Sequence, residues 1–196
     1  MFQSLVDQVS GSPWTYAFLF AVAAVDVVFP LVPSEASVIT AGVLAASGDL
    51  VLPLVILAAA AGAWIGDTTS YVVGRTLGTR AVRRFFAGEK ARGRLAWAER
   101  LLRTRGPYLI VVSRFIPGGR TATTFTAGLV EYPWRSRFLP FSVLAALIWG
   151  SYAGLIGYLG GSIFEEQPLY GLLLAFGIAA AITVAVEGYR RVFRPA

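Results

Sequence analysis

The feature that most constrains this sequence is residues 107–131, PYLIVVSRFIPGGRTATTFTAGLVE, an apolar segment of membrane length with a break at its centre. The break is the tripeptide Pro-Gly-Gly at 117–119, with Arg114 and Arg120 on either side. Proline removes a helical hydrogen bond and clashes with the preceding turn, and glycine favours leaving the helix. Because an arginine near the bilayer centre costs about 2.5–3.5 kcal/mol on insertion scales, we expect the break to have a function.

Each arm of this segment has about ten residues and would rise about 15 Å, which is half of a hydrocarbon core about 30 Å thick. We therefore predict that 107–131 is a re-entrant hairpin whose tip is buried in protein or lines a wet cavity. Two guanidinium groups at such a tip would form a site for an anion. The alternative is a proline-kinked helix that spans the membrane, with arginines that snorkel to the interface.

Composition indicates an integral membrane protein. Of the 196 residues 56% are hydrophobic and 14% are charged, whereas about 25% are charged in soluble domains. The sequence has no cysteine and no histidine, which excludes disulfides, thiolate or imidazole metal sites and any histidine base. We expect no cofactor and no metal. The first basic residue is Arg75, so the net charge of +6 is localised and does not by itself indicate nucleic-acid binding.

The N-terminal part of the chain predicts two membrane segments. Residues 13–29 are apolar with an aromatic start, and we predict a first transmembrane span there. Residues 30–48 contain two prolines, of which the second is Pro33, followed by Glu35. With a charged tip and about twenty residues, this interval is predicted to be a first re-entrant hairpin.

The next predicted span, 51–76, carries small residues at every fourth position, a pattern that lets another helix approach closely. Asp67 lies beside this ridge of small residues. Its side chain could be hydrogen-bonded within the bundle or face a water-filled cavity. Alternatively, it has a direct functional role and supports the site.

Residues 79–105 carry nine basic and two acidic residues. Apolar residues recur there at spacings of three and four, so we predict an amphipathic helix that lies on an anionic membrane face. By the positive-inside rule that face is cytoplasmic. Spans are further predicted at 138–161 and 168–188, and re-entrance of 107–131 keeps the C-terminal arginines on the cytoplasmic side.

The two broken segments resemble each other. Residues 27–42, VVFPLVPSEASVITAG, and 111–128, VVSRFIPGGRTATTFTAG, each have an apolar run, a proline, a charged residue and then Ala-Gly. One segment is acidic and the other is basic. We therefore predict an all-α polytopic protein of two inverted-topology repeats, each a re-entrant hairpin plus a transmembrane helix, with the amphipathic helix between them.

These segments also resemble a known family. The acidic and proline-rich stretch at residues 26–35, the helix GAWIGDTTSYVVGRTLG and the segment RFIPGGR followed by Ala-Gly are similar to the DedA family, the bacterial branch of the SNARE-associated Golgi and VTT-domain proteins. The similarity covers roughly residues 20–162.

The resemblance implies that the protein moves lipids between leaflets, as a proton-coupled translocase of undecaprenyl phosphate or as a phospholipid scramblase. It places the chain in the bacterial inner membrane. The functional residues of the family are two membrane-embedded acids and two arginines, which correspond here to Asp26, Glu35, Arg114 and Arg120.

A mechanism follows as a hypothesis. Arg114 and Arg120 would hold the phosphate of a lipid headgroup while the hydrophobic tail stays in the bilayer. Glu35, and secondarily Asp26, would pair with the arginines in the empty site and take up a proton when phosphate displaces them. Asp67, Pro33 and the turn formed by Pro117, Gly118 and Gly119 would support this site.

Several alternatives remain. The charges could only fix the packing of the two hairpins, or the same scaffold could exchange ions or small solutes. We expect that the protein is not an enzyme. Membrane lipid phosphatases use histidine, which this sequence lacks, and its four aspartates are too scattered for a metal-dependent phosphotransferase. The expected partners are lipids with anionic headgroups and protons, without nucleic acid. The oligomeric state stays open, a homodimer being one alternative.

Overall fold

The computed structural model describes residues 13–27, 33–85, 89–116, 118–163 and 177. Within these residues the chain is helical and contains no strand, which confirms the predicted all-α class. Six α-helices, a 3-10 turn and a π-helical turn follow one another along the described chain: α2 (Pro13–Val25), α3 (Ser34–Ala46), α4 (Leu52–Phe85), α5 (Glu89–Val112), η1 (Ser113–Phe115), α6 (Gly119–Leu129), η2 (Trp134–Phe138) and α7 (Leu139–Ile163).

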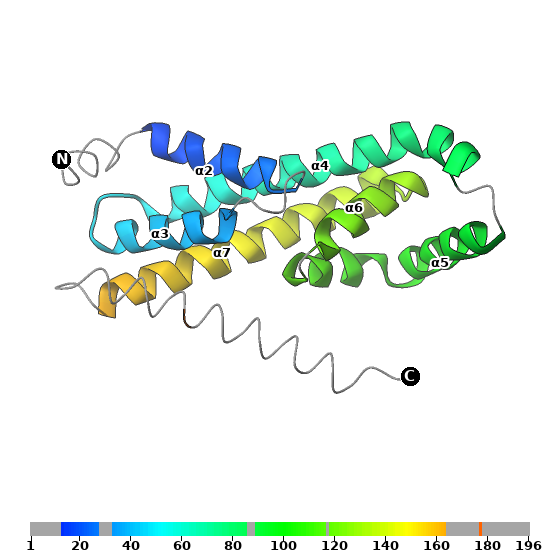
Figure 1. Ribbon diagram of the computed structural model, residues 1–196. Helices are drawn as coiled ribbons and strands as arrows, with labels where there is room; N and C mark the ends of the chain where they lie inside the picture. The colour runs from blue at the N-terminus through cyan, green and yellow to red at the C-terminus, as the bar shows by residue number, and fades with distance from the viewer. Residues whose placement is uncertain (1–12, 28–32, 86–88, 117, 164–176, 178–196) are drawn as a thin grey trace.

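Two long helices run the length of the molecule side by side (Figure 1). The apolar stretches Leu52–Leu77 of α4 and Trp134–Ser162 of η2 and α7 have 26 and 29 residues. At 1.5 Å per residue, both exceed the roughly 30 Å that a hydrocarbon core requires. They overlap the spans predicted at 51–76 and 138–161, whereas the span predicted at 168–188 falls outside the described residues, apart from 177.

Short helices occupy the two ends of this pair. Figure 1 shows α2 and α3 beside the N-terminal half of α4, and α6 beside its C-terminal half, while α5 packs against α6 and α7. The helices α2 and α3 have 13 residues each, which corresponds to about 20 Å. The breaks between α2 and α3 and between α5 and α6 therefore both lie near the middle of the long helices.

The first break differs from its prediction. The predicted hairpin at 30–48 would need two arms, but Ser34–Ala46 is a single helix that begins directly after Pro33. The chain reverses direction instead between α2 and α3, so that α2, which lies within the span predicted at 13–29, runs beside α3 (Figure 1). The physical reason is that Pro33 directly precedes α3, where a proline is tolerated, and does not break a helix into two arms.

The predicted amphipathic helix at 79–105 is also divided. Its first residues continue α4 to Phe85, and the remainder belongs to α5 from Glu89 onward. The helix α5 is itself interrupted at Arg105, just before Pro107, where φ is −129° and ψ is 17°. This kink separates the charged part of α5 from its apolar end, with which the predicted hairpin at 107–131 begins.

Small residues bring the helices close together, as their spacing predicts. A Cβ atom at Gly62 would overlap the carbonyl oxygen of Phe20 in α2, and one at Gly74 would overlap that of Phe125 in α6. A Cβ atom at Gly157 of α7 would likewise overlap the carbonyl oxygen of Ile39 in α3. The ridge on α4 thus holds both groups of short helices against the same long helix.

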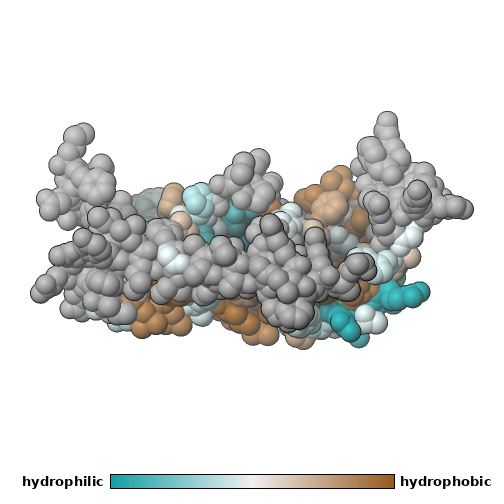
Figure 2. Space-filling view, turned by 60° about the horizontal axis from the view of Figure 1, so that its bottom comes forward, coloured by the Kyte–Doolittle hydropathy of each residue, from teal (hydrophilic) through white to brown (hydrophobic). Residues whose placement is uncertain are grey.

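The outer surface of α4 and α7 is apolar. Figure 2 shows several patches of brown, hydrophobic surface on the visible described part of this face, with hydrophilic residues at one end and near the middle. Large side chains point outward from both long helices, as soluble monomers rarely allow on this scale: Leu54, Leu57, Ile65, Val72, Val73, Leu77, Leu144, Leu147, Ile148, Leu155 and Leu159. This surface suits contact with lipid.

The buried apolar residues form two clusters. One joins α2, α3 and the first half of α4 to the middle and second half of α7, and includes Val38, Val55 and Ala153. The other joins the second half of α4 to α5, α6 and the start of α7, and includes Tyr71 and Phe138. Between them, α4 carries a buried acid.

Candidate functional site

The site is centred on Asp67, which lies near the middle of the apolar stretch Leu52–Leu77 and is 1% exposed. Both of its carboxylate oxygens bind an arginine from the second break. Arg114 Nη1 donates to Asp67 Oδ2 at 2.7 Å, and Arg120 Nε donates to Asp67 Oδ1 at 2.6 Å. A single carboxylate on the long helix α4 therefore forms an ion pair with each of the two arginines.

Arg120 uses all three of its nitrogens. Besides the bond to Asp67, its Nη1 lies 3.2 Å from Asp26 Oδ2, and its Nη2 donates to the carbonyl oxygen of Ala63 at 2.9 Å. Asp26 Oδ2 also accepts a hydrogen bond from Ser34 Oγ at 2.8 Å. Arg120 thus links α6 to α4 and to both sides of the first break.

Arg114 is bound on only one side. It is 8% exposed, and its guanidinium lies 5.1 Å from the ring centre of Trp149, a cation–π distance. Within the described part of the chain, its Nε and Nη2 atoms are buried without a hydrogen-bond partner. A buried donor left unsatisfied costs about 1–3 kcal/mol, and more when it is charged, so this arrangement needs an explanation.

Local backbone geometry sets the positions of the two arginines. Arg114 lies in the 3-10 turn η1, after which the chain becomes extended at Ile116. Gly118 has a φ of +70°, in the left-handed region that glycine adopts without strain, and it precedes the first residue of α6, Gly119. Because of this turn, Arg120 lies in the first turn of α6.

Hydroxyl groups fasten the start of α6 to its neighbours. Thr121 Oγ1 donates to the carbonyl oxygen of Val27 at 2.9 Å, and Thr124 Oγ1 donates to Ser70 Oγ at 2.9 Å. Ser142 Oγ of α7 reaches Asp67 Oδ2 at a longer 3.4 Å. Three elements therefore reach the acid on α4: η1 through Arg114, α6 through Arg120 and α7 through Ser142.

The family model described as the VTT domain matches residues 32–159, which is more than half of the chain. The chain belongs to the VTT-domain, or DedA, family. It is therefore a membrane protein of that family, as its resemblance predicts.

Named relatives agree with this membership. The chain is 36% identical over 138 residues to the inner membrane protein YohD of Escherichia coli, covering 70% of this chain and 69% of YohD. An uncharacterized membrane protein of Mycobacterium leprae is 30% identical over 86% of this chain and 77% of its own length. The protein DedA of E. coli is 28% identical, covering 88% and 81%. No solved structure gives a significant match.

The structure brings together four of the predicted residues, Asp26, Asp67, Arg114 and Arg120. Asp67, Arg114 and Arg120 fall inside the matched range, while Asp26 lies just before it. The cluster of these four residues, called the four-charge cluster below, is electrically neutral. Asp67 was expected to support the site from beside the glycine ridge, and it is instead the carboxylate that both arginines share.

Glu35 is placed differently from its prediction. It lies in the first turn of α3 and is exposed, and among the described residues it forms no hydrogen bond or ion pair. The expected pairing of Glu35 with the arginines is therefore not observed, because Asp67 and Asp26 occupy them. Glu35 is nevertheless near enough to interact electrostatically with Asp26 and Tyr152.

The remaining predicted residues shape the two breaks. Pro33 directly precedes α3 without a side-chain capping bond, and Gly118 and Gly119 form the turn before Arg120. Pro117 falls outside the described residues. One signal for the central role of Asp67 was available in the sequence, since an acid in the middle of an apolar span is costly and is a functional candidate by default.

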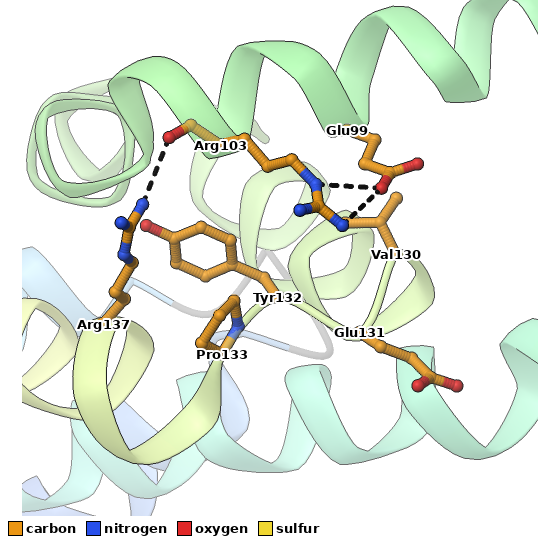
Figure 3. A pocket seen from close by; sticks show the side chains of 7 residues that line it. All are labelled: Glu99, Arg103, Val130, Glu131, Tyr132, Pro133 and Arg137. Atoms are coloured by element: carbon orange, nitrogen blue, oxygen red, sulfur yellow. Dashed lines mark hydrogen bonds and ion pairs between the residues drawn. The ribbon is translucent and has the colours of Figure 1, made fainter.

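A separate pocket lies beside the charged part of α5 (Figure 3). It has a volume of about 320 Å³ and is lined by Glu99, Arg103, Val130, Glu131, Tyr132, Pro133 and Arg137. Arg103 pairs with Glu99 at 2.9 Å, and Arg137 Nη1 donates to the carbonyl oxygen of Arg103 at 3.2 Å. Its exposed arginines are thus engaged by neighbours, and the pocket shares no residue with the four-charge cluster. No group of three or more potential metal-ligating side chains occurs in the described residues.

Proposed function

We propose that this protein moves a phosphate-bearing lipid between the leaflets of the bacterial inner membrane, with undecaprenyl phosphate as the substrate and with proton coupling. The observation that supports this most strongly is that Arg114 and Arg120 both pair with Asp67, near the middle of the apolar stretch Leu52–Leu77, and that Arg114 is buried with two nitrogens that have no partner among the described residues. Arginine is suited to phosphate because its planar fork presents parallel N–H groups to two oxygens.

The arrangement of the short helices fits alternating access to such a site. We propose that α2 with α3, and the end of α5 with α6, are re-entrant pairs that enter from opposite faces as inverted repeats. The charged part of α5 and the C-terminus then lie on the cytoplasmic side, following the positive-inside rule. Broken backbone at membrane depth is tolerated in such pairs because protein surrounds it.

Proton coupling is supported by charge balance. The four-charge cluster is neutral, so a bound phosphate would add uncompensated negative charge in a region of low dielectric. Proton uptake by a nearby acid offsets that charge. Glu35 is the best placed, because its protonation breaks no ion pair, and Asp26 is the second candidate because its single pair with Arg120 is partly exposed.

The apolar exterior supports a lipid over a soluble substrate. Leu, Ile and Val side chains cover the outward faces of α4 and α7, so the hydrophobic tail of a lipid can remain in the bilayer while its headgroup enters the protein. The enclosure of the arginines favours a second candidate, an exchanger of small inorganic anions, because such ions need no lateral opening. A passive phospholipid scramblase is a third.

The proposal is tested by leaflet exchange of a labelled polyprenyl phosphate in proteoliposomes with an imposed pH gradient. We expect wild type to move the lipid, Arg120→Ala to lose movement, and Glu35→Gln to lose its dependence on the gradient. Correct insertion of each variant is checked by size-exclusion chromatography before reconstitution. Retained transport in Arg120→Ala would remove the site assignment, and competition by inorganic phosphate at equal potency would favour the anion exchanger.

A further inference from the structure

The two arginines of the cluster are not equivalent. Each nitrogen of Arg120 already binds an oxygen, two of them from carboxylates and one from the backbone of Ala63. Arg114 binds through Nη1 alone, and its Nε and Nη2 atoms are buried without a partner among the described residues. Every nitrogen of Arg120 is therefore bound by the protein, whereas two of the three nitrogens of Arg114 have no partner among the described residues.

The unused donors of Arg114 form one edge of the guanidinium plane. The Nε–H bond and one Nη2–H bond point in the same direction along that edge, which is the geometry that binds two oxygens of a phosphate or carboxylate together. The opposite side is fixed by Asp67 at 2.7 Å, and Trp149 lies over the guanidinium. The free edge is thus held in one orientation before any ligand arrives.

We infer that the phosphate group binds to the Nε–Nη2 edge of Arg114, and that Arg120 is a positioning residue that holds Asp67 and Asp26 in place. This inference rests on the proposed function, because it takes a phosphate group as the ligand. The chemistry that the edge recognises is a phosphate with two free oxygens, either on a lipid or as the inorganic ion. Since the edge has no solvent contact, a ligand reaches it only when part of the surrounding structure moves.

The positioning role of Arg120 follows from what it contacts. Its side chain connects the start of α6 to α4 and, through Asp26, to the end of α2. Asp67 in turn holds Nη1 of Arg114, so that the orientation of the free edge depends on Arg120 through the shared carboxylate. Arg120 acts on the ligand through another residue and needs no contact with it.

Arg114→Lys and Arg120→Lys form a matched pair of variants for the test. Each keeps a positive charge that can pair with Asp67, but an ammonium group cannot present two parallel N–H bonds on one edge while it holds the acid. Binding of radiolabelled polyprenyl phosphate and of inorganic phosphate is measured separately on the full-length protein in nanodiscs. We expect Arg114→Lys to weaken binding by about tenfold or more, and Arg120→Lys by about threefold or less, with a lower thermal unfolding midpoint for the latter.

A measurement on wild type keeps the test independent of the folding of Arg120→Lys. With ¹⁵N-labelled arginine, the Nε–H resonance that disappears in Arg114→Lys should be the one that shifts most when phosphate is added. Equal losses in the two variants, or a shift in another arginine, would overturn the division of roles while leaving phosphate binding intact. If wild type binds neither the lipid nor inorganic phosphate, the proposed function itself fails.

Discussion

The two breaks in this protein carry opposite charges and are anchored in different ways. The first, between α2 and α3, contributes Asp26 and Glu35, whereas the second, between η1 and α6, contributes Arg114 and Arg120. Both arginines are bound by acids, but within the described part of the chain only one of the two acids of the first break is bound by an arginine. The difference arises because Asp67, which lies on the long helix α4 and belongs to neither break, forms ion pairs with both arginines.

This comparison separates two tasks. The second break is locked to α4 by short ion pairs and by hydroxyl bonds such as that of Thr124 with Ser70. The first break contacts it through a longer ion pair at 3.2 Å and the bond from Thr121 to the carbonyl oxygen of Val27. We infer that the second break holds the ligand-binding group, and that the first carries the acid that is free to exchange a proton.

The largest loss of stability is expected from removing Asp67, the acid that pairs with both arginines of the second break. Asp67→Ala leaves Arg114 and Arg120 buried without their shared counter-ion, and breaking a buried pair in this way typically costs about 3–5 kcal/mol. We expect poor recovery of folded protein and a strongly lowered thermal unfolding midpoint in detergent. Asp67→Asn, which keeps an acceptor oxygen, should lose less. A stable Asp67→Ala protein would show that the second break is not locked by this carboxylate.

The next effect compares the two ends of the α4 ridge. Gly62→Val should push α2 away, and Gly74→Val should push α6 away, because either side chain would meet a backbone carbonyl oxygen. Overpacking of this kind costs about 1–3 kcal/mol. Gly93→Val serves as the control, since nothing lies within 4 Å of a Cβ atom there. If unfolding midpoints fall equally in all three variants, close helix approach is not the cause.

A smaller effect is expected at the contact between the two breaks. Asp26→Asn removes the charge from a partly exposed ion pair with Arg120, and Ser34 can still donate to the remaining oxygen. We expect a loss of about 1 kcal/mol or less in stability, together with weaker proton dependence of transport. A loss as large as that of Asp67→Ala would mean that the first break is locked as firmly as the second.

The smallest stability effect is expected at Glu35. Because its side chain is exposed and unpaired in the described structure, Glu35→Gln should change the free energy of unfolding by less than about 0.5 kcal/mol. Transport should nevertheless stop responding to a pH gradient. The informative comparison is therefore between thermal unfolding and gradient-driven exchange on the same preparation. Unchanged gradient dependence would assign the proton to Asp26 or Asp67 instead.

Much of the fold could be predicted because its signals are local. Long apolar stretches identify α4 and the helix that follows Trp134, and the four-residue spacing of small residues predicts the close contacts of Gly62 and Gly74. The partner of α3 could not be predicted in the same way. Residues 13–25 are apolar enough to be predicted as part of a span, and only the tertiary arrangement shows that this 13-residue helix packs against α3.

The residues of the site could be predicted from the sequence, but which acid pairs with which arginine could not. A charged residue in an apolar segment is conspicuous, so Asp26, Asp67, Arg114 and Arg120 could all be identified from the sequence. Which acid meets which arginine depends on the rotation of α4 about its axis and on the turn at Gly118, which sequence spacing does not determine. The prediction that Glu35 pairs with the arginines is wrong for this reason, and Asp67 takes that position.

We propose that the wild-type protein moves one class of lipid across the bilayer in response to a proton gradient. The deciding measurement follows a labelled polyprenyl phosphate and a labelled glycerophospholipid in parallel in proteoliposomes, with and without a pH gradient. We predict that the polyprenyl phosphate changes leaflets faster than in protein-free liposomes, that the gradient accelerates it, and that the glycerophospholipid does not move. Equal movement of both lipids without any effect of the gradient, or movement of neither, would contradict this account.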